Sequence, residues 1–163
     1  MRSKELIDEI SGKSYDMIVS MDEILWSIDP NNDTMEKTLQ RIFEFANTLQ
    51  TAHGASIDIV VHDKVKDLRL DMKVRHDFFI VCKEALQYLA RYSSNKNIMA
   101  DIDLVWSKIV VKILSVGSET EEGAAQMQEL RKNLVELASA MQAHLNFEIG
   151  KRDTSIVLTI PVS

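Results

Sequence analysis

Apolar side chains in this chain of 163 residues recur every three to four residues in some segments and every second residue in others. The first period is typical of amphipathic helices and the second of strands with one buried face. The pattern predicts helices over residues 4–28, 33–51, 74–89 and 127–141, and strands over 57–61, 98–105, 109–114, 145–149 and 156–160. This order predicts an α/β (α+β) fold, a two-layer sandwich of a mixed, mostly antiparallel sheet with helices on one face, preceded by a long N-terminal helix.

The N-terminal helix carries an apolar stripe that is suited to a coiled-coil or bundle partner, so a homodimer through this helix is possible. Its members are Ile10, Met17, Met21, Ile24 and Ile28. Pro30 ends the helix and divides the chain into residues 1–30 and residues 31–163.

The second helix shows a start signal and an apolar face. Asp33, followed three residues later by Glu36, predicts a capping box at its beginning. Its buried face is expected to consist of Leu39, Ile42, Phe43, Ala46 and Leu49.

Three connecting segments can be placed between the predicted elements. A charged link follows the first strand, a short turn near Ser107 and Lys108 joins two strands into a hairpin, and residues 115–123 form a polar, acidic loop.

Composition excludes several classes of protein. With 25 acidic and 19 basic residues the formal net charge is −6, which gives no electrostatic reason to bind nucleic acid or an anionic membrane. No apolar run approaches the roughly 20 residues that cross a bilayer, and the N-terminus lacks the apolar core of a signal peptide. The only cysteine, Cys82, falls in an apolar helical pattern and is expected to be a small buried side chain. These features are consistent with a cytoplasmic location, either of a free protein or of the cytoplasmic part of a membrane-bound one.

Four segments resemble, in the expected order, parts of the sensor histidine kinases of bacterial two-component systems. MDEILWSIDPNND (21–33) is similar to the end of their second dimerisation helix, and the predicted helix over residues 33–51 is similar to the first helix of the ATP domain. KEALQYLARYS (83–93) resembles the asparagine-bearing helix of that domain, and RDTSIVLTIPV (152–162) resembles its closing hairpin. The chain therefore resembles their catalytic and ATP-binding domain, in the superfamily shared with gyrase and MutL. The resemblance implies an α/β sandwich that holds nucleotide between the helical layer and a mobile lid.

The resemblance also implies roles for residues of the third helix. Glu84 matches the family glutamate that orients or deprotonates the attacking group. Tyr88 replaces the metal-binding asparagine, and a phenol suits magnesium poorly because magnesium takes hard oxygen ligands in a tight octahedron. Gln87 has suitable chemistry but points about a hundred degrees away around the helix. Arg91 and Tyr92 match positions near the nucleotide, although an ordinary surface arginine and a half-buried ring are the alternative.

The other nucleotide motifs depart further from the family pattern. Ser115 stands where the family aspartate of DxGxG accepts a hydrogen bond from adenine, and Gly117 is the one glycine of that motif that is kept. A neutral hydroxyl is expected to hold adenine less strongly than a carboxylate. The lid region carries Glu119, Glu121 and Glu122, which either repel a triphosphate or point into solvent.

The histidines do not supply a phosphoacceptor or a predicted metal site. The family phosphoacceptor lies upstream of the first helix seen here, whereas the first histidine of this chain is His53. The four histidines show no metal-ligand spacing, so the sequence predicts no zinc site. They are His53, His62, His76 and His144.

Two functions remain open at this point. The first is a degenerate kinase-like domain of a two-component sensor with weak or lost ATP binding, acting through contacts with a response regulator or a partner kinase and needing no cofactor. The second is an active domain that uses ATP and magnesium to phosphorylate a histidine outside this chain.

Overall fold

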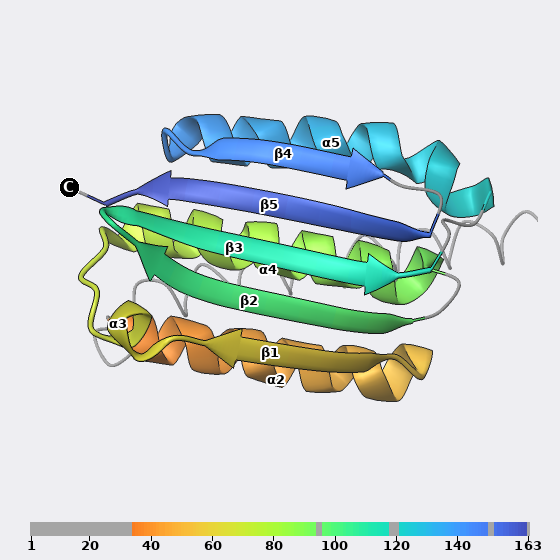
Figure 1. Cartoon of the computed structure of the whole chain (residues 1–163), viewed down its shortest axis with the longest axis horizontal. Helices are drawn as coiled ribbons and strands as arrows, with labels where there is room; N and C mark the ends of the chain where they lie inside the picture. Colours follow the sequence, from red (N-terminus) through yellow and green to blue (C-terminus); the bar gives the residue numbers. More distant parts are fainter. Residues whose placement is uncertain (1–33, 94–95, 118–120, 150–151, 163) are drawn as a thin grey trace, which may run out of the picture. The chain divides into compact units, whose positions relative to one another are not determined.

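The described residues form a sheet with helices packed on one of its faces (Figure 1). The structure is a computed structural model, and it describes residues 34–93, 96–117, 121–149 and 152–162. In chain order the elements are α2 (Met35–His53), β1 (Ser56–Val61), α3 (Asp63–Lys66), α4 (Met72–Tyr92), β2 (Asn97–Val105), β3 (Lys108–Val116), α5 (Glu121–Ala140), β4 (His144–Ile149) and β5 (Asp153–Pro161). The predicted N-terminal helix, its apolar stripe and the division near residue 30 lie outside the described residues.

The sheet is mixed and mostly antiparallel, as the sequence predicts. Its strand order is β1-β2-β3-β5-β4, where β1 and β2 are parallel and every other neighbouring pair is antiparallel. The β2–β3 and β4–β5 pairs are the two predicted hairpins. The first of them turns at Trp106 and Ser107, one residue earlier than predicted, and Trp106 takes a positive φ of 57° there.

The core lies between the sheet and the helices because every second strand residue faces the helical layer. On the three central strands the buried apolar residues are Ile98, Ala100, Ile102, Ile109, Val111, Ile113, Ile156, Leu158 and Ile160. Helix α4 lies in the middle of the helical layer, with contacts to both α2 and α5. It supplies Phe78, Leu86 and Leu89 to the core, each no more than 1% exposed.

Helix α2 differs from the sequence prediction at its start and on one face. Its N-cap is Thr34, whose Oγ1 accepts a hydrogen bond from the Lys37 N–H at 3.1 Å, so the predicted capping box with Asp33 as the cap is wrong. Phe43 is 41% exposed and does not belong to the buried face, whereas Leu39, Ile42, Ala46 and Leu49 do. The helix ends at Gly54, which adopts the left-handed conformation with φ 65°.

Two connecting segments contain regular structure that the sequence did not predict. Strand β3 extends to Val116 through pairing with Asp153, and α5 begins at Glu121, so the prediction of a loop over residues 115–123 is wrong at both of its ends. The charged link after β1 contains α3, a single helical turn whose Val65 is fully buried.

The outer face of the sheet, opposite the helices, mixes polar and apolar side chains. One crosswise row runs through Asp58, Met99, Leu114, Ser155 and Glu148. Met99 near the middle of this row is 56% exposed. Among the described residues, no helix has the length and apolarity needed to span a bilayer.

Candidate functional site

A cavity of about 260 Å³ lies between α4 and α5. Five of the residues that line it are those that the sequence singled out on α4. The lining residues are Glu84, Gln87, Tyr88, Arg91, Tyr92, Gln126, Glu129, Leu130 and Asn133. The two helices therefore bring one predicted cluster against a second group of polar side chains.

Helical geometry explains why the five α4 residues share this cavity. Counted from Glu84, the other four residues follow at three, four, seven and eight positions, and such positions lie along one face of a helix. Gln87 and Tyr88 are neighbours in sequence, yet both reach the cavity. Gln87 lies on its exposed rim, whereas Tyr88 is buried.

Tyr88 connects the two helices that form the cavity. Its side chain is 6% exposed, and its hydroxyl donates a hydrogen bond to the Gly123 carbonyl oxygen at 2.8 Å. Gly123 lies in the first turn of α5, so this bond joins the last turns of α4 to the start of α5. The Tyr88 ring also contacts the Tyr92 ring, with 5.2 Å between the ring centroids. A buried tyrosine that satisfies its hydroxyl in this way acts as part of the packing.

The charges around the cavity include one cation and two carboxylates. Arg91 is exposed, and its guanidinium lies 5.3 Å from the centroid of the Tyr92 ring, within the range of a cation–π contact. Glu84 contributes a carboxylate from α4, and Glu129 contributes one from α5. The formal charges of these three side chains sum to −1, so the cavity has no excess of positive charge.

Ser115 lies near the end of β3 and Gly117 directly follows this strand, and neither lines the cavity. Ser115 is fully buried, and its Oγ lies 2.6 Å from the Oγ of Ser93, the residue that follows α4. Gly117 has a φ of 144°, a conformation that favours glycine, and its N–H donates to the Arg152 carbonyl at 2.7 Å. Both residues therefore have structural contacts, and their predicted part in holding adenine stays a prediction.

The sequence interpretation missed the cavity residues of α5. Gln126, Glu129 and Asn133 are polar residues on an exposed helix face, and nothing in their local pattern distinguishes them from other solvated side chains. Glu129 follows Gln126 by three positions, and Asn133 follows Glu129 by four, so the three side chains lie on the face of the helix that also carries Leu130. This helical spacing was the signal in the sequence that could have identified them. Glu119 lies outside the described residues, as do the side chains of Glu121 and Glu122.

The fold is that of histidine kinase catalytic domains. The histidine kinase domain of a blue-light-activated kinase from Erythrobacter litoralis is similar with a TM-score of 0.64 and 12% identity over 80% of this chain, and the chain spans 64% of that domain. Acinetobacter baumannii histidine kinase AdeS gives a TM-score of 0.67 at 10% identity, covering 97% of this chain and 84% of AdeS. The catalytic domain of histidine kinase ThkA gives 0.59 at 9% identity, covering 78% of this chain and 93% of ThkA. No protein-family model and no curated protein matches the chain.

Proposed function

We propose that this chain contains a histidine-kinase-like domain with a weak or lost nucleotide site, which acts in signal transduction through contacts with other proteins. The observation that carries the proposal is the hydrogen bond from the Tyr88 hydroxyl to the Gly123 carbonyl. The sequence resemblance places a metal-binding asparagine at position 88. A buried ring stands there instead, and its hydroxyl holds α5 against α4.

The residues around the cavity fit magnesium and a triphosphate poorly. Magnesium requires hard oxygen ligands in near-octahedral geometry, and the Tyr88 hydroxyl is directed at a backbone carbonyl. Glu84 and Glu129 would each oppose phosphate charge, by about 1 kcal/mol per charge pair at 4 Å in water. The cavity of about 260 Å³ is also smaller than the roughly 300–1,000 Å³ of typical ligand sites.

An active kinase domain is the second candidate, and one observation favours it. Glu84, which matches the family's catalytic glutamate, lines the same cavity as Arg91, the cation that could meet a phosphate. In this alternative the cavity would widen when α5 moves away from α4, and the phosphoacceptor histidine would lie outside the chain.

Thermal unfolding with and without magnesium–ATP separates the two candidates. Ligand at 100 times its dissociation constant stabilises a protein by roughly 2.7 kcal/mol, which is readily measured. We expect no shift for the unmodified chain at millimolar magnesium–ATP. A clear shift that disappears in both Glu84→Ala and Arg91→Ala would contradict the proposal and favour the active kinase.

Tyr88→Phe provides a matched variant because it removes the hydroxyl and keeps the ring. We expect this variant to lose about 0.5–1.5 kcal/mol of unfolding free energy, since the hydrogen bond to Gly123 is absent, and still to show no shift with magnesium–ATP. Unchanged stability would contradict the structural role assigned to this hydroxyl. A new shift with magnesium–ATP would indicate that the hydroxyl alone closes the site.

The partners belong to the same proposal. We expect a cytoplasmic domain that forms a homodimer through the apolar stripe of residues 4–28 and contacts a response regulator or a partner kinase. Sedimentation of the whole chain, beside a Met21→Glu, Ile24→Glu double variant, tests the homodimer. Charges in the stripe should convert dimer to monomer. A monomer at high concentration for the unmodified chain, or an equal dimer for both, would contradict pairing through this stripe.

A further inference from the structure

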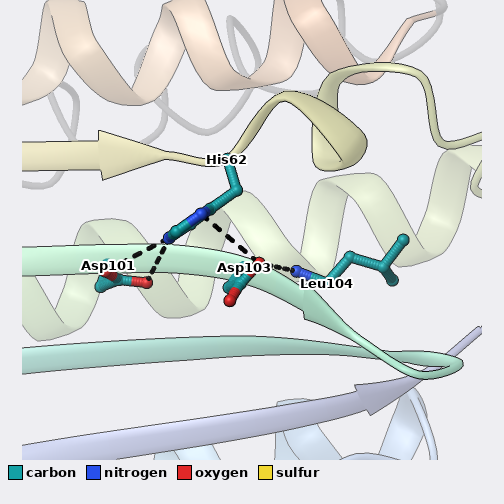
Figure 2. Close-up of polar contacts among 4 residues, drawn as sticks. All are labelled: His62, Asp101, Asp103 and Leu104. Carbon is teal, nitrogen blue, oxygen red and sulfur yellow. Dashed lines mark hydrogen bonds and ion pairs between the residues drawn. The ribbon is translucent and has the colours of Figure 1, made fainter.

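Three side chains that can bind a metal ion meet on the outer face of the sheet, where β1 ends beside β2. Figure 2 shows the His62 imidazole between the carboxylates of Asp101 and Asp103. Its Nε2 lies 3.2 Å from Asp101 Oδ1, and its Nδ1 lies 3.6 Å from Asp103 Oδ1. One candidate ligand atom from each residue lies within 4.8 Å of the other two. These three residues are called the His62 cluster below.

The backbone positions all three side chains of the His62 cluster. Asp101 and Asp103 are two positions apart on β2, so both project from the same face of the sheet. His62 follows β1 directly, and its N–H donates to the carbonyl of Ile102, the residue between the two aspartates, at 3.0 Å. Asp103 Oδ1 accepts a hydrogen bond from the Leu104 N–H at 2.7 Å. Two of the three residues therefore lie on a strand, which holds ligands more precisely than a loop does, and a backbone hydrogen bond ties the third to that strand.

We propose that the His62 cluster binds a divalent transition-metal ion of the zinc type. An imidazole nitrogen and two carboxylate oxygens are ligands that zinc uses at about 2.0–2.2 Å, and three protein ligands leave a position for water. The two carboxylates and a neutral imidazole sum to a formal charge of −2, which a divalent ion balances. Calcium and magnesium prefer oxygen ligands alone, so the imidazole favours zinc over both.

Because the three side chains of the cluster are partly exposed, their ligand atoms can move the short distance towards one another that binding a single metal ion requires. The side chains of His62, Asp101 and Asp103 are 44%, 54% and 36% exposed. Each can rotate without disturbing the core on the opposite face of the sheet. Bound metal would join the end of β1 to β2, its neighbour among the described strands, and so stabilise the parallel pair.

The charged neighbour of the cluster on the next strand is Lys112. Lys112 is in register with Asp101 on β3, whereas Asp103 is in register with the uncharged Val110. A cation beside Asp101 competes electrostatically with a bound metal ion, and removing it should strengthen binding. Lys112→Gln is therefore expected to bind zinc more tightly than the unmodified chain.

Calorimetric titration of the untagged, chelator-treated chain with zinc chloride tests the proposal. We expect about one zinc ion per chain at this site, and at least about tenfold weaker binding in both His62→Ala and Asp103→Asn. Asp103→Asn keeps a side-chain oxygen that can accept from the Leu104 N–H. Asp58→Asn and His144→Ala are matched controls, because both residues are exposed on the same outer face, and neither should change the affinity.

Two results would overturn the proposal. One is a zinc affinity in His62→Ala equal to that of the unmodified chain, which would place any bound zinc elsewhere. The other is the absence of zinc binding at millimolar concentration, together with a loss of thermal stability in metal-free His62→Ala. That combination would identify the cluster as an ion-paired contact between β1 and β2 and nothing more.

Discussion

The hydroxyl oxygens of Ser93 and Ser115 lie 2.6 Å apart in the buried layer between helix and sheet. Ser93 follows the last residue of α4, and Ser115 is the penultimate residue of β3. Ser93 is 6% exposed and Ser115 is 0% exposed, so water does not readily replace this contact. The bond therefore joins the cavity-lining helix to a central strand of the sheet.

A double-mutant cycle should show that these two hydroxyls act as a pair. We expect Ser93→Ala and Ser115→Ala each to lower the unfolding free energy by about 1–3 kcal/mol, because each leaves the other hydroxyl buried without this partner. The double variant should cost less than the sum of the single variants. Urea unfolding followed by circular dichroism measures all four proteins. Strictly additive costs would show that the contact contributes nothing as a pair.

The Cys82 thiol should be unreactive in the folded chain. Burial raises its pKa from 9.0 to about 12, since a thiolate would lose its hydration in the core. A disulfide reagent at pH 8 is expected to modify Cys82 only as fast as the domain opens, and rapidly in denaturant. Fast modification under native conditions would mean that the thiol is accessible.

The same raised pKa makes stability depend on alkaline pH. The folded thiol keeps its proton to a higher pH than the unfolded thiol, so this contribution is fully present below pH 9 and is lost as the pH rises from 9 towards about 12. The difference in unfolding free energy between the unmodified chain and Cys82→Ala should therefore shrink over this window. A difference that stays constant from pH 8 to pH 11 contradicts the prediction.

Gly54 should resist substitution for a reason that involves the backbone alone. Its φ is 65°, and an added Cβ would meet no atom within 4 Å. Gly54→Ala is therefore expected to lower the unfolding free energy by about 1 kcal/mol through left-handed strain without any steric clash. Gly54→Asn should cost less because asparagine tolerates this conformation better. Urea unfolding of both variants checks the order, and equal costs would contradict it.

Most of the fold could be predicted because its elements have strong periodic patterns. The buried apolar residues of β2, β3 and β5 occupy every second position, and the buried apolar residues of α4 recur at helical spacing, so local sequence identifies both. The end of β3 could not be predicted, because Val116 is held in the strand by pairing with Asp153, which lies 37 positions later. Helix α3 is too short to show any period.

Only the α4 residues of the candidate site could be predicted from the sequence. Helical spacing places Glu84, Tyr88 and Arg91 together, and the structure gives them a common cavity. The partner residues on α5 depend on how two helices pack, which local sequence does not encode. The His62 cluster was missed for a related reason, because His62 and Asp101 are 39 positions apart and meet only through the parallel pairing of β1 with β2.

The crosswise row on the outer face of the sheet also disfavours self-association of the chain through its sheet edges. The row ends in a carboxylate at each edge strand, Asp58 on β1 and Glu148 on β4. An edge strand with open backbone groups invites a second copy to add another strand, and charged side chains there discourage it. Two copies that met edge to edge through β1, or through β4, would bring like charges close together. The exposed Met99 can therefore remain near the middle of the sheet while its edges oppose growth into larger assemblies.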